Sequence, residues 1–334
     1  MQRLFWFLLL LLLVSITFGV SLGPVPIPVA NVWGIAADRL GLLTGGEWPT
    51  AQVNIVWLIR FPRVLLAAFV GGGLAVVGVT LQALVRNPLA DPFLLGITSG
   101  ASVGAVLAIG VGFFAFAGVY GVSVGAFAGA LLAFVIVFVM AHRGGRITPT
   151  RLILAGVAVA YVFGGITSFI TLTSENRLLA GQVLSWTLGS LARATWADLT
   201  LPAFCLLIGS LYLTVQARSL NALLMGDESA TGLGIDVARL RRRLFVVTSL
   251  ITGVLVAVSG SIGFIGLVIP HLVRLFVGSD HRRVLPVALF VGSSFLIWVD
   301  VIARTAFAPI ELPVGVITAL FGGPFFLWLL WRQE

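Results

Sequence analysis

The sequence predicts an all-α, polytopic membrane protein with about ten transmembrane helices, and two observations carry that prediction. Hydrophobic types make up 59% of the 334 residues and charged types only 10%, whereas a soluble domain is usually about 45–50% apolar and about 25% charged. The apolar runs are continuous, which disfavours a β-barrel, whose strands alternate with a period of two. The composition also excludes a disordered chain, a secreted disulfide scaffold and an ordinary cytosolic enzyme.

The expected spans follow from the charge-poor runs, because a transmembrane helix needs about 20 apolar residues. Residues 4–20 form the first run, and no A-x-A-like site follows it, which favours an uncleaved span over a signal peptide. Residues 93–141 are long enough for two spans that turn near residues 118–121. The eighth span is short and contains Pro270, which indicates a broken helix of the kind that transporters place near a substrate path. The remaining spans are expected at 64–85, 152–174, 199–217, 244–263, 264–279 (the eighth), 284–303 and 312–331.

Two polar segments separate these spans and set the expected orientation. Residues 23–56 are predicted to be a periplasmic segment, either a lid or a partly embedded helix, and residues 218–243 a cytoplasmic loop with one helical stretch at 220–233. With the N-terminus inside, fourteen of the 20 basic residues fall on the inner side, in agreement with the positive-inside rule. Both termini are therefore expected in the cytoplasm, and we treat residues 1–334 as a single transmembrane domain. The net charge of +8 then reflects topology, and we expect no nucleic-acid partner.

The residue types restrict the chemistry of the chain. The sequence has no lysine, so it lacks the lysine of a phosphate-binding P-loop, and ATP and Mg would have to bind another polypeptide. The three histidines lack metal-ligand spacing and Cys205 is the only cysteine, so we expect no metal site, no disulfide and no bound cofactor. The residues show no hydrolytic constellation, and we expect no enzymatic activity in this chain.

No carboxylate lies in the middle of an expected span, although the short eighth span contains His271 and Arg274. Asp300 and Arg304 lie four residues apart near the end of the ninth span, a spacing that indicates a helix-end ion pair. A proton-driven carrier usually needs a charge deeper in a span. A gradient-driven secondary transporter is therefore the disfavoured alternative from another class, and a receptor or assembly subunit that does not transport is a third.

Glycine recurs every four residues in two predicted spans. Gly96, Gly100 and Gly104 would lie on one face of a helix, and Gly121, Gly125 and Gly129 on one face of another. Such smooth faces allow close backbone approach, and we favour helix packing over a pore-lining role.

Four sequence blocks, taken in order, resemble the permeases of iron-siderophore, heme and vitamin B12 importers, the FecCD-type family. The resemblance covers the chain from about residue 55 to its end. The blocks are Arg60-Phe61-Pro62-Arg63; Asn87-Pro88-Leu89-Ala90-Asp91-Pro92, followed by Leu94-Leu95-Gly96 and Ser99-Gly100-Ala101; Gly263-Phe264-Ile265-Gly266-Leu267-Val268-Ile269-Pro270-His271; and Glu311-Leu312-Pro313-Val314-Gly315.

The resemblance implies a type II ABC importer permease architecture in a bacterial inner membrane. Two copies of such a chain would form a homodimer, with the pathway at the dimer interface and alternating access to either side of the lipid bilayer. Two ATP-binding subunits would dock inside, and a periplasmic substrate-binding protein would deliver cargo outside. An iron chelate, either heme or a siderophore, is the expected cargo, with cobalamin as the alternative.

The resemblance also implies roles for particular residues. The residues alone leave two interpretations of the Arg60–Arg63 pair open, namely snorkelling at the interface and capture of an acidic partner; the family pattern favours docking. Asp227 stands where the family pattern has a glutamate, and Pro149 also departs from the pattern. The expected docking residues for the binding protein are Arg60, Arg63 and Arg304. The expected ATPase-coupling residues are Gly226, Asp227, Glu228, Ser229, Ala230, Leu233 and Gly234. The expected cytoplasmic gate comprises Asn87, Leu89, Thr148 and Thr150.

Overall fold

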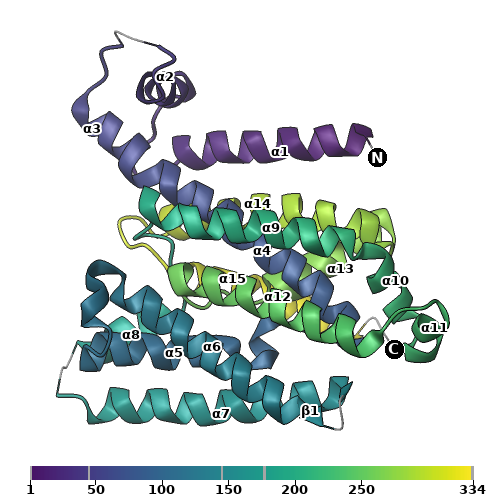
Figure 1. The fold of residues 1–334 in the computed structure, drawn as a ribbon. Helices are drawn as coiled ribbons and strands as arrows, with labels where there is room; N and C mark the ends of the chain where they lie inside the picture. Colours follow the sequence, from purple (N-terminus) through teal and green to yellow (C-terminus); the bar gives the residue numbers. More distant parts are fainter. Residues whose placement is uncertain (1, 44–45, 144–145, 176–177, 332–334) are drawn as a thin grey trace.

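The computed structural model describes residues 2–43, 46–143, 146–175 and 178–331, and shows a bundle of helices (Figure 1). Seven described helical segments are long and apolar enough to cross a membrane, and three shorter apolar helices accompany them. Together they correspond one for one to the ten predicted spans, so the predicted fold class is confirmed. These helices are α1 Gln2–Ser21, α4 Phe61–Val85, α5 Ile97–Val106, α6 Gly121–Ala141, α7 Pro149–Thr173, α9 Thr200–Val215, α12 Val237–Ser259, α13 Ile265–Val277, α14 His281–Thr305 and α15 Val314–Trp331.

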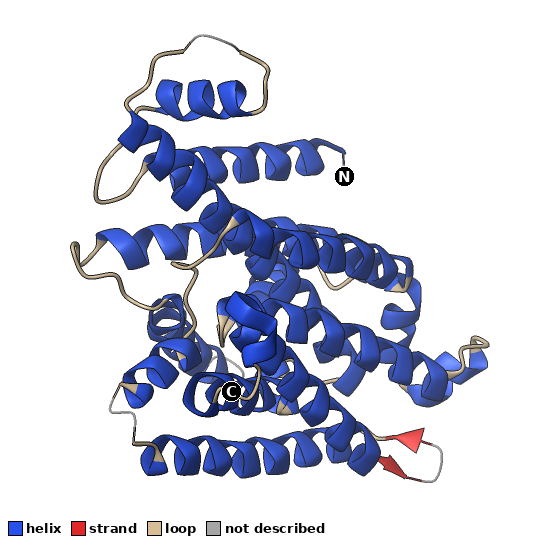
Figure 2. Ribbon diagram, turned by 60° about the vertical axis from the view of Figure 1, so that its left-hand side comes forward, coloured by secondary structure: helices blue, strands red, loops and turns tan. Residues whose placement is uncertain are grey.

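Shorter elements connect the long helices. Figure 2 shows that nearly all of the described chain is helical, apart from one small hairpin in which His142 pairs with Ile147 and Arg143 with Arg146. This hairpin and α8 were not predicted, because both are too short to produce an apolar run of span length. The connecting elements are α2 Val29–Arg39, α3 Thr50–Val53, the π-helical η1 Asn54–Arg60, η2 Pro92–Leu95, η3 Leu107–Val111, η4 Ala115–Tyr120, β1 His142–Arg143, β2 Arg146–Ile147, α8 Leu179–Thr187, η5 Trp196–Leu199, α10 Ala217–Leu224 and α11 Asp227–Gly232.

Helix α4 forms the centre of the bundle. It is apolar around its whole circumference, which is typical of a buried helix, and it packs against α14, α12, α13 and α9. Two glycines allow this packing. A Cβ atom on Gly71 would overlap the carbonyl oxygen of Gly292 in α14, and one on Gly78 would overlap that of Gly266 in α13.

The predicted glycine contact lies between α5 and α6. Gly100 meets the backbone of Gly129, and Gly104 meets that of Gly125, so closely that a Cβ atom on either helix would overlap a carbonyl oxygen of the other. The packing interpretation is therefore confirmed for these two pairs. Gly96 differs from them, because it adopts φ 71° ahead of α5 and lies against Gly156 and Val159 of α7.

The predicted eighth span is short but continuous, because α13 runs through Pro270, and the chain breaks ahead of it. Helix α12 ends at Ser259 and α13 begins at Ile265, while Gly260 and Phe264 both adopt positive φ, at 67° and 68°. The break lies before Pro270, which sits inside α13. Thus α13 is a helix of 13 residues that starts within the bundle.

The elements divide between two ends of the bundle. Figure 1 places the start of α1, the hairpin β1–β2, and α10 and α11 toward one end, and α2, α3 and α8 toward the other. Residues 218–243 thus lie at the same end as the start of the chain, as predicted. The predicted periplasmic segment 23–56 is partly helical, since it contains α2 and α3.

Candidate functional site

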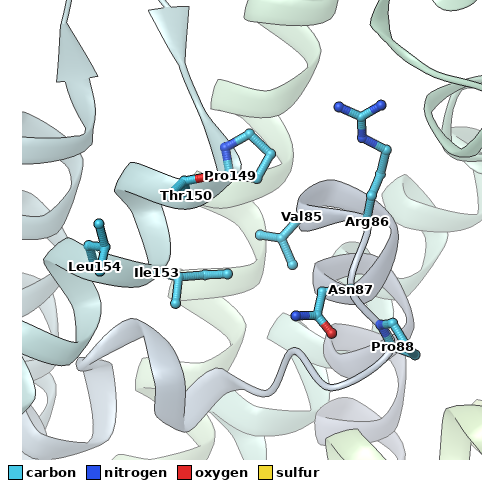
Figure 3. Close-up of a pocket in the computed structure, with 8 residues that line it drawn as sticks. All are labelled: Val85, Arg86, Asn87, Pro88, Pro149, Thr150, Ile153 and Leu154. Carbon is cyan, nitrogen blue, oxygen red and sulfur yellow. The ribbon is translucent and has the colours of Figure 1, made fainter.

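A hollow of about 390 Å³ opens between the end of α4 and the start of α7 (Figure 3). Asn87 and Thr150, two of the four predicted gate residues, both line it. Leu89 is half-buried and Thr148 is exposed, and neither lines the hollow. The lining residues are Val85, Arg86, Asn87, Pro88, Pro149, Thr150, Ile153 and Leu154.

The loop that carries Asn87 is held by its own hydrogen bonds. Helix α4 ends in a left-handed residue, Arg86 at φ 52°, and the backbone N–H of Asn87 then donates to the carbonyl of Gln82 at 3.1 Å. The side-chain oxygen of Asn87 accepts from the backbone N–H of Leu89 at 2.9 Å. On the other wall, Pro149 is the first residue of α7, a position where proline costs nothing because that N–H has no intrahelical partner. The departure from the family pattern at Pro149 therefore fits a helix start.

A buried carboxylate follows the loop. Asp91 is 7% exposed, and its Oδ1 accepts from the backbone N–H of Phe93 at 2.9 Å at the start of η2. Burial raises the pKa of Asp91 to about 6. A Cβ atom on Gly266 would lie 3.2 Å from Asp91 Oδ2, so the loop and α13 are in close contact here.

Polar side chains also join α4 to α13 at this end. Gln82 Nε2 donates to the carbonyl of Gly266 at 3.1 Å, and Arg274 Nη1 donates to Gln82 Oε1 at 2.6 Å. These bonds fix the last turn of α4 relative to α13, and hence the start of the loop at residues 86–91, which we call the gate loop.

Residues 220–233 span two short helices, α10 and α11, and the predicted coupling segment, residues 226–234, begins at the break between them. The single helical stretch expected at 220–233 is therefore wrong. The chain breaks at Gly226, which adopts φ 107°, a conformation that residues with a Cβ rarely take. Apolar side chains lie exposed around the break: Leu224 is 45% exposed, Met225 71% and Leu233 66%.

The two acidic residues of α11 have different surroundings. Asp227 faces α12: its carboxylate accepts hydrogen bonds from Arg241 at 2.7 and 2.8 Å and lies 3.4 Å from Arg86. Glu228 is exposed, as are Ser229 and the predicted pair Leu233 and Gly234, whereas Ala230 is buried. The structure thus distinguishes Glu228 as the outward-facing carboxylate, which the sequence left undecided.

The three predicted docking arginines lie near the opposite end and are buried, with 4%, 5% and 2% exposure for Arg60, Arg63 and Arg304. Arg60 donates to three backbone carbonyls, those of Val20 and Ser21 at 3.0 Å each and that of Val25 at 2.6 Å. These bonds tie η1 to the end of α1. The prediction placed these side chains facing the outer compartment, and in this conformation they do not.

An ionic cluster surrounds Asp300, which has no exposed surface. Arg63 Nε donates to Asp300 at 2.9 Å, and Arg63 Nη1 donates to Glu311 at 2.8 Å. Arg304 lies 3.3 Å from Asp300 and also donates to the carbonyl of Gly19. The predicted helix-end pair of Asp300 and Arg304 is therefore present, but Asp300 hydrogen-bonds to Arg63 of α4. Within the cluster, only Glu311 presents a substantially exposed side chain, at 41%.

Comparison with known proteins identifies the family. The family model described as the FecCD transport family matches residues 10–332. The chain belongs to the FecCD transport family. It is 41% identical over 331 residues to the hemin transport system permease protein HmuU of Yersinia pestis, covering 98% of this chain and 95% of that protein. It is 45% identical over 285 residues to the cobalamin import system permease protein BtuC of Halobacterium salinarum, covering 85% of this chain and 75% of that protein.

A solved structure shares the fold over the whole length. A metal-chelate type ABC transporter in an inward-facing conformation superposes with a TM-score of 0.85 at 30% identity, covering 99% of this chain and all of that one. This FecCD protein is therefore a multi-span permease of an ABC importer.

Several residues of this FecCD chain that shape the two sites were not predicted from the sequence. Arg86 and Arg241 flank Asp227, and Gln82 and Arg274 hold the gate loop. Asn221 of α10 bonds to the start of α14. The sequence shows no motif for these pairings, because the partners lie far apart along the chain.

Proposed function

We propose that this chain is the membrane subunit of an ATP-driven importer that moves an iron chelate, heme or a siderophore, from the periplasm to the cytoplasm. Family membership implies two partners, an ATP-binding subunit and a substrate-binding protein. Two copies of the chain would form the pathway at their interface in a bacterial inner membrane, with both termini in the cytoplasm. The observation that carries the proposal is the location of α10–α11 beside the gate loop, joined through Asp227 and Arg86.

The exposed parts of α10 and α11 suit a protein partner on the cytoplasmic side. Leu224, Met225 and Leu233 offer apolar contact area, and Glu228 lies beside them at the start of α11. Short helices that insert an apolar face into a groove are a common mode of recognition. We assign this surface to the ATP-binding subunit, which would also hold the ATP and Mg; no cofactor is assigned to this chain.

Gating is assigned to the hollow between α4 and α7. Opening and closing would change the separation of the two walls that carry Asn87 and Thr150. Alternating access requires two such arrangements of the same packed helices, with nucleotide binding in the partner shifting the balance between them.

Docking of the substrate-binding protein is assigned to the end with α2, α3 and the ionic cluster. Direct pairing of Arg63 with a partner carboxylate would require Glu311 to give way, since Glu311 holds the outer nitrogen of that guanidinium. Arg60 and Arg304 would support the surface from below, through their bonds to α1. Reversing the charge of Arg63 or Arg304 is a poor test of docking, because both pair with the buried Asp300 and removing one partner of a buried ion pair costs about 3–5 kcal/mol of folding stability.

The cargo assignment rests on the hemin permease, which matches this chain over nearly the full length of both proteins. The cobalamin permease at 45% identity supports cobalamin as the second candidate. A gradient-driven carrier is the remaining alternative from another class, and the location of the described Asp300 at a helix end, paired with two arginines, disfavours it.

The test is ATPase activity and uptake in liposomes that contain this chain together with the ATP-binding protein encoded beside it. The binding protein is added empty or loaded with heme, a ferric siderophore or cobalamin. Stimulated hydrolysis and uptake with one iron chelate support the proposal, and stimulation with cobalamin alone selects the alternative. Uptake driven by a proton gradient without any ATPase contradicts both.

A further inference from the structure

The carboxylate of Asp227 is shared by two arginines from different parts of the fold. Arg241, on α12, is 4% exposed and donates to both oxygens of Asp227, at 2.7 and 2.8 Å. Arg86, at the end of α4, lies 3.4 Å from Asp227 Oδ1. One coupling-segment residue therefore contacts both a long helix and the residue that begins the gate loop.

The two contacts differ in strength. The Arg241 contact is bidentate and its side chain is buried, an arrangement that gives both geometric specificity and energy. The Arg86 contact is longer, and the side chains of Arg86 and Asp227 are 41% and 42% exposed. Exposed pairs of this kind are weak. Asp227 therefore moves with α11 and α12, whereas Arg86 can be released by a modest displacement of α11.

Release of Arg86 would act directly on the gate. Arg86 is the left-handed residue that ends α4, and it lines the same hollow as Asn87 and Thr150. Through its ion pair with Asp227, the Arg86 guanidinium links the lining of that hollow to α11. Gly226 lies beside it as well, since a Cβ atom there would be 3.7 Å from Arg86 Nη1.

We propose that Asp227 is a positioning residue that couples α11 to the gate by holding Arg86 in one conformation of the transporter and releasing it in the other. The proposal deepens the proposed function and rests on it. In the conformation described here Arg86 is held. When the ATP-binding subunit displaces α11, with exposed Glu228 as its contact, Asp227 follows Arg241 and separates from Arg86, and the gate loop then becomes free to rearrange.

The experiment uses the full complex in liposomes and compares Arg86→Gln with Arg239→Gln. Arg239 is a matched control, because it forms an exposed pair with Asp236 at 3.3 Å in the same segment and does not line the hollow. A reporter cysteine, Leu154→Cys in a Cys205→Ser background, is labelled from the cytoplasmic side with a membrane-impermeant maleimide, with and without trapped ATP. Leu154 lines the hollow and is 63% exposed.

We expect nucleotide to change the labelling rate in the parent and in Arg239→Gln, and not in Arg86→Gln. The cargo moved per ATP should fall about tenfold in Arg86→Gln, a typical size for coupling between sites, while the complex still assembles and hydrolyses ATP. Exchanging the two charges, with Arg86→Asp and Asp227→Arg together, is unsuitable because Arg241 would then face a like charge. Arg86→Lys is the conservative variant instead. It keeps a positive charge beside Asp227 and should retain part of the coupling that Arg86→Gln loses.

The outcomes separate the two proposals. A parent chain that forms no complex with any ATP-binding subunit contradicts the proposed function itself. A parent that couples normally, with Arg86→Gln showing the same labelling change and the same cargo per ATP, overturns only the Asp227 link. A loss of thermal stability in isolated Arg86→Gln as large as that of Asp227→Asn would also overturn it, by showing a merely structural contact.

Discussion

The side-chain amide of Asn221 donates a hydrogen bond to Asp280 Oδ1 at 2.7 Å, and so joins α10 to the start of α14. The side-chain oxygen Oδ1 of Asn221 accepts a hydrogen bond from the backbone N–H of His281 at 2.9 Å and lies 2.7 Å from the His281 ring Nδ1. Because α10 and α14 both pack along α4, this side chain adds a polar link to the packing that connects α10 to the central helix.

Replacing Asn221 with Asp should make stability dependent on pH at this junction. The bond from Asn221 lowers the pKa of Asp280. In Asn221→Asp two carboxylates face each other, which favours protonation of one of them. We expect a lower melting temperature at pH 7.5 that recovers toward pH 5, measured on the detergent-solubilised chain. Asn221→Ala loses the same bonds without adding charge, so its deficit should not vary with pH; identical profiles for the two variants would contradict the prediction.

Asp91 should give the folded chain a second pH dependence, of defined sign. Its pKa is raised from 3.8 to about 6 by burial, so the folded state binds a proton more tightly than the unfolded state. The contribution of Asp91 to folding stability should be largest below about pH 4 and should be lost as the pH rises through about 6. The total loss should be about 3 kcal/mol at most. Asp91→Asn keeps an oxygen for the Phe93 N–H, and should flatten this part of a melting-temperature profile. An unchanged slope in the variant would show that Asp91 is not the group responsible.

The glycine contact between α5 and α6 should not tolerate even one methyl group. Gly104→Ala would press a Cβ atom into the carbonyl of Gly125, and overpacking of this kind costs about 1–3 kcal/mol. Gly181→Ala on α8 is the control, because no atom lies within 4 Å of a Cβ there. The first variant should lose several degrees of melting temperature and the second none. Equal melting temperatures would show that the helices can separate without cost.

The elements that depend on local apolar runs could be predicted from the sequence. The contacts that depend on pairing between distant residues could not. The ten spans could be placed because each is an apolar run of consecutive residues, whereas the break after Ser259 was not predicted, since the seventh span was expected to continue to residue 263. The burial of Arg63 could not, since its partners Asp300 and Glu311 lie 237 and 248 residues away. From the sequence alone, an arginine at a span end and an arginine inside an ionic cluster look the same.

The coupling segment shows the same limit on a smaller scale. The sequence identified residues 226–234 through the family resemblance, but not which carboxylate faces outward. That depends on Arg241, 14 residues from Asp227 along the chain, and on Arg86, which precedes the whole segment. The two helices were predicted as one because glycine at 226 is compatible with a helix interior in sequence, and only its φ of 107° shows the break.

Glu311→Gln should strengthen docking of the substrate-binding protein if Arg63 takes part in it. Glu311 is 41% exposed and occupies Arg63 Nη1 at 2.8 Å, so it competes with any partner carboxylate for that nitrogen. The variant removes the competing charge and leaves the bond between Arg63 and Asp300 in place. We expect the dissociation constant for the binding protein to fall severalfold at low salt, with the gain shrinking as salt rises, because rim charges are screened. Glu175→Gln is the matched control, since Glu175 is an exposed acid in the loop between α7 and α8, and it should give a smaller gain. Equal gains would mean that only net charge matters, and weaker docking of Glu311→Gln would mean that Glu311 itself contacts the partner; either result removes Arg63 from the docking surface.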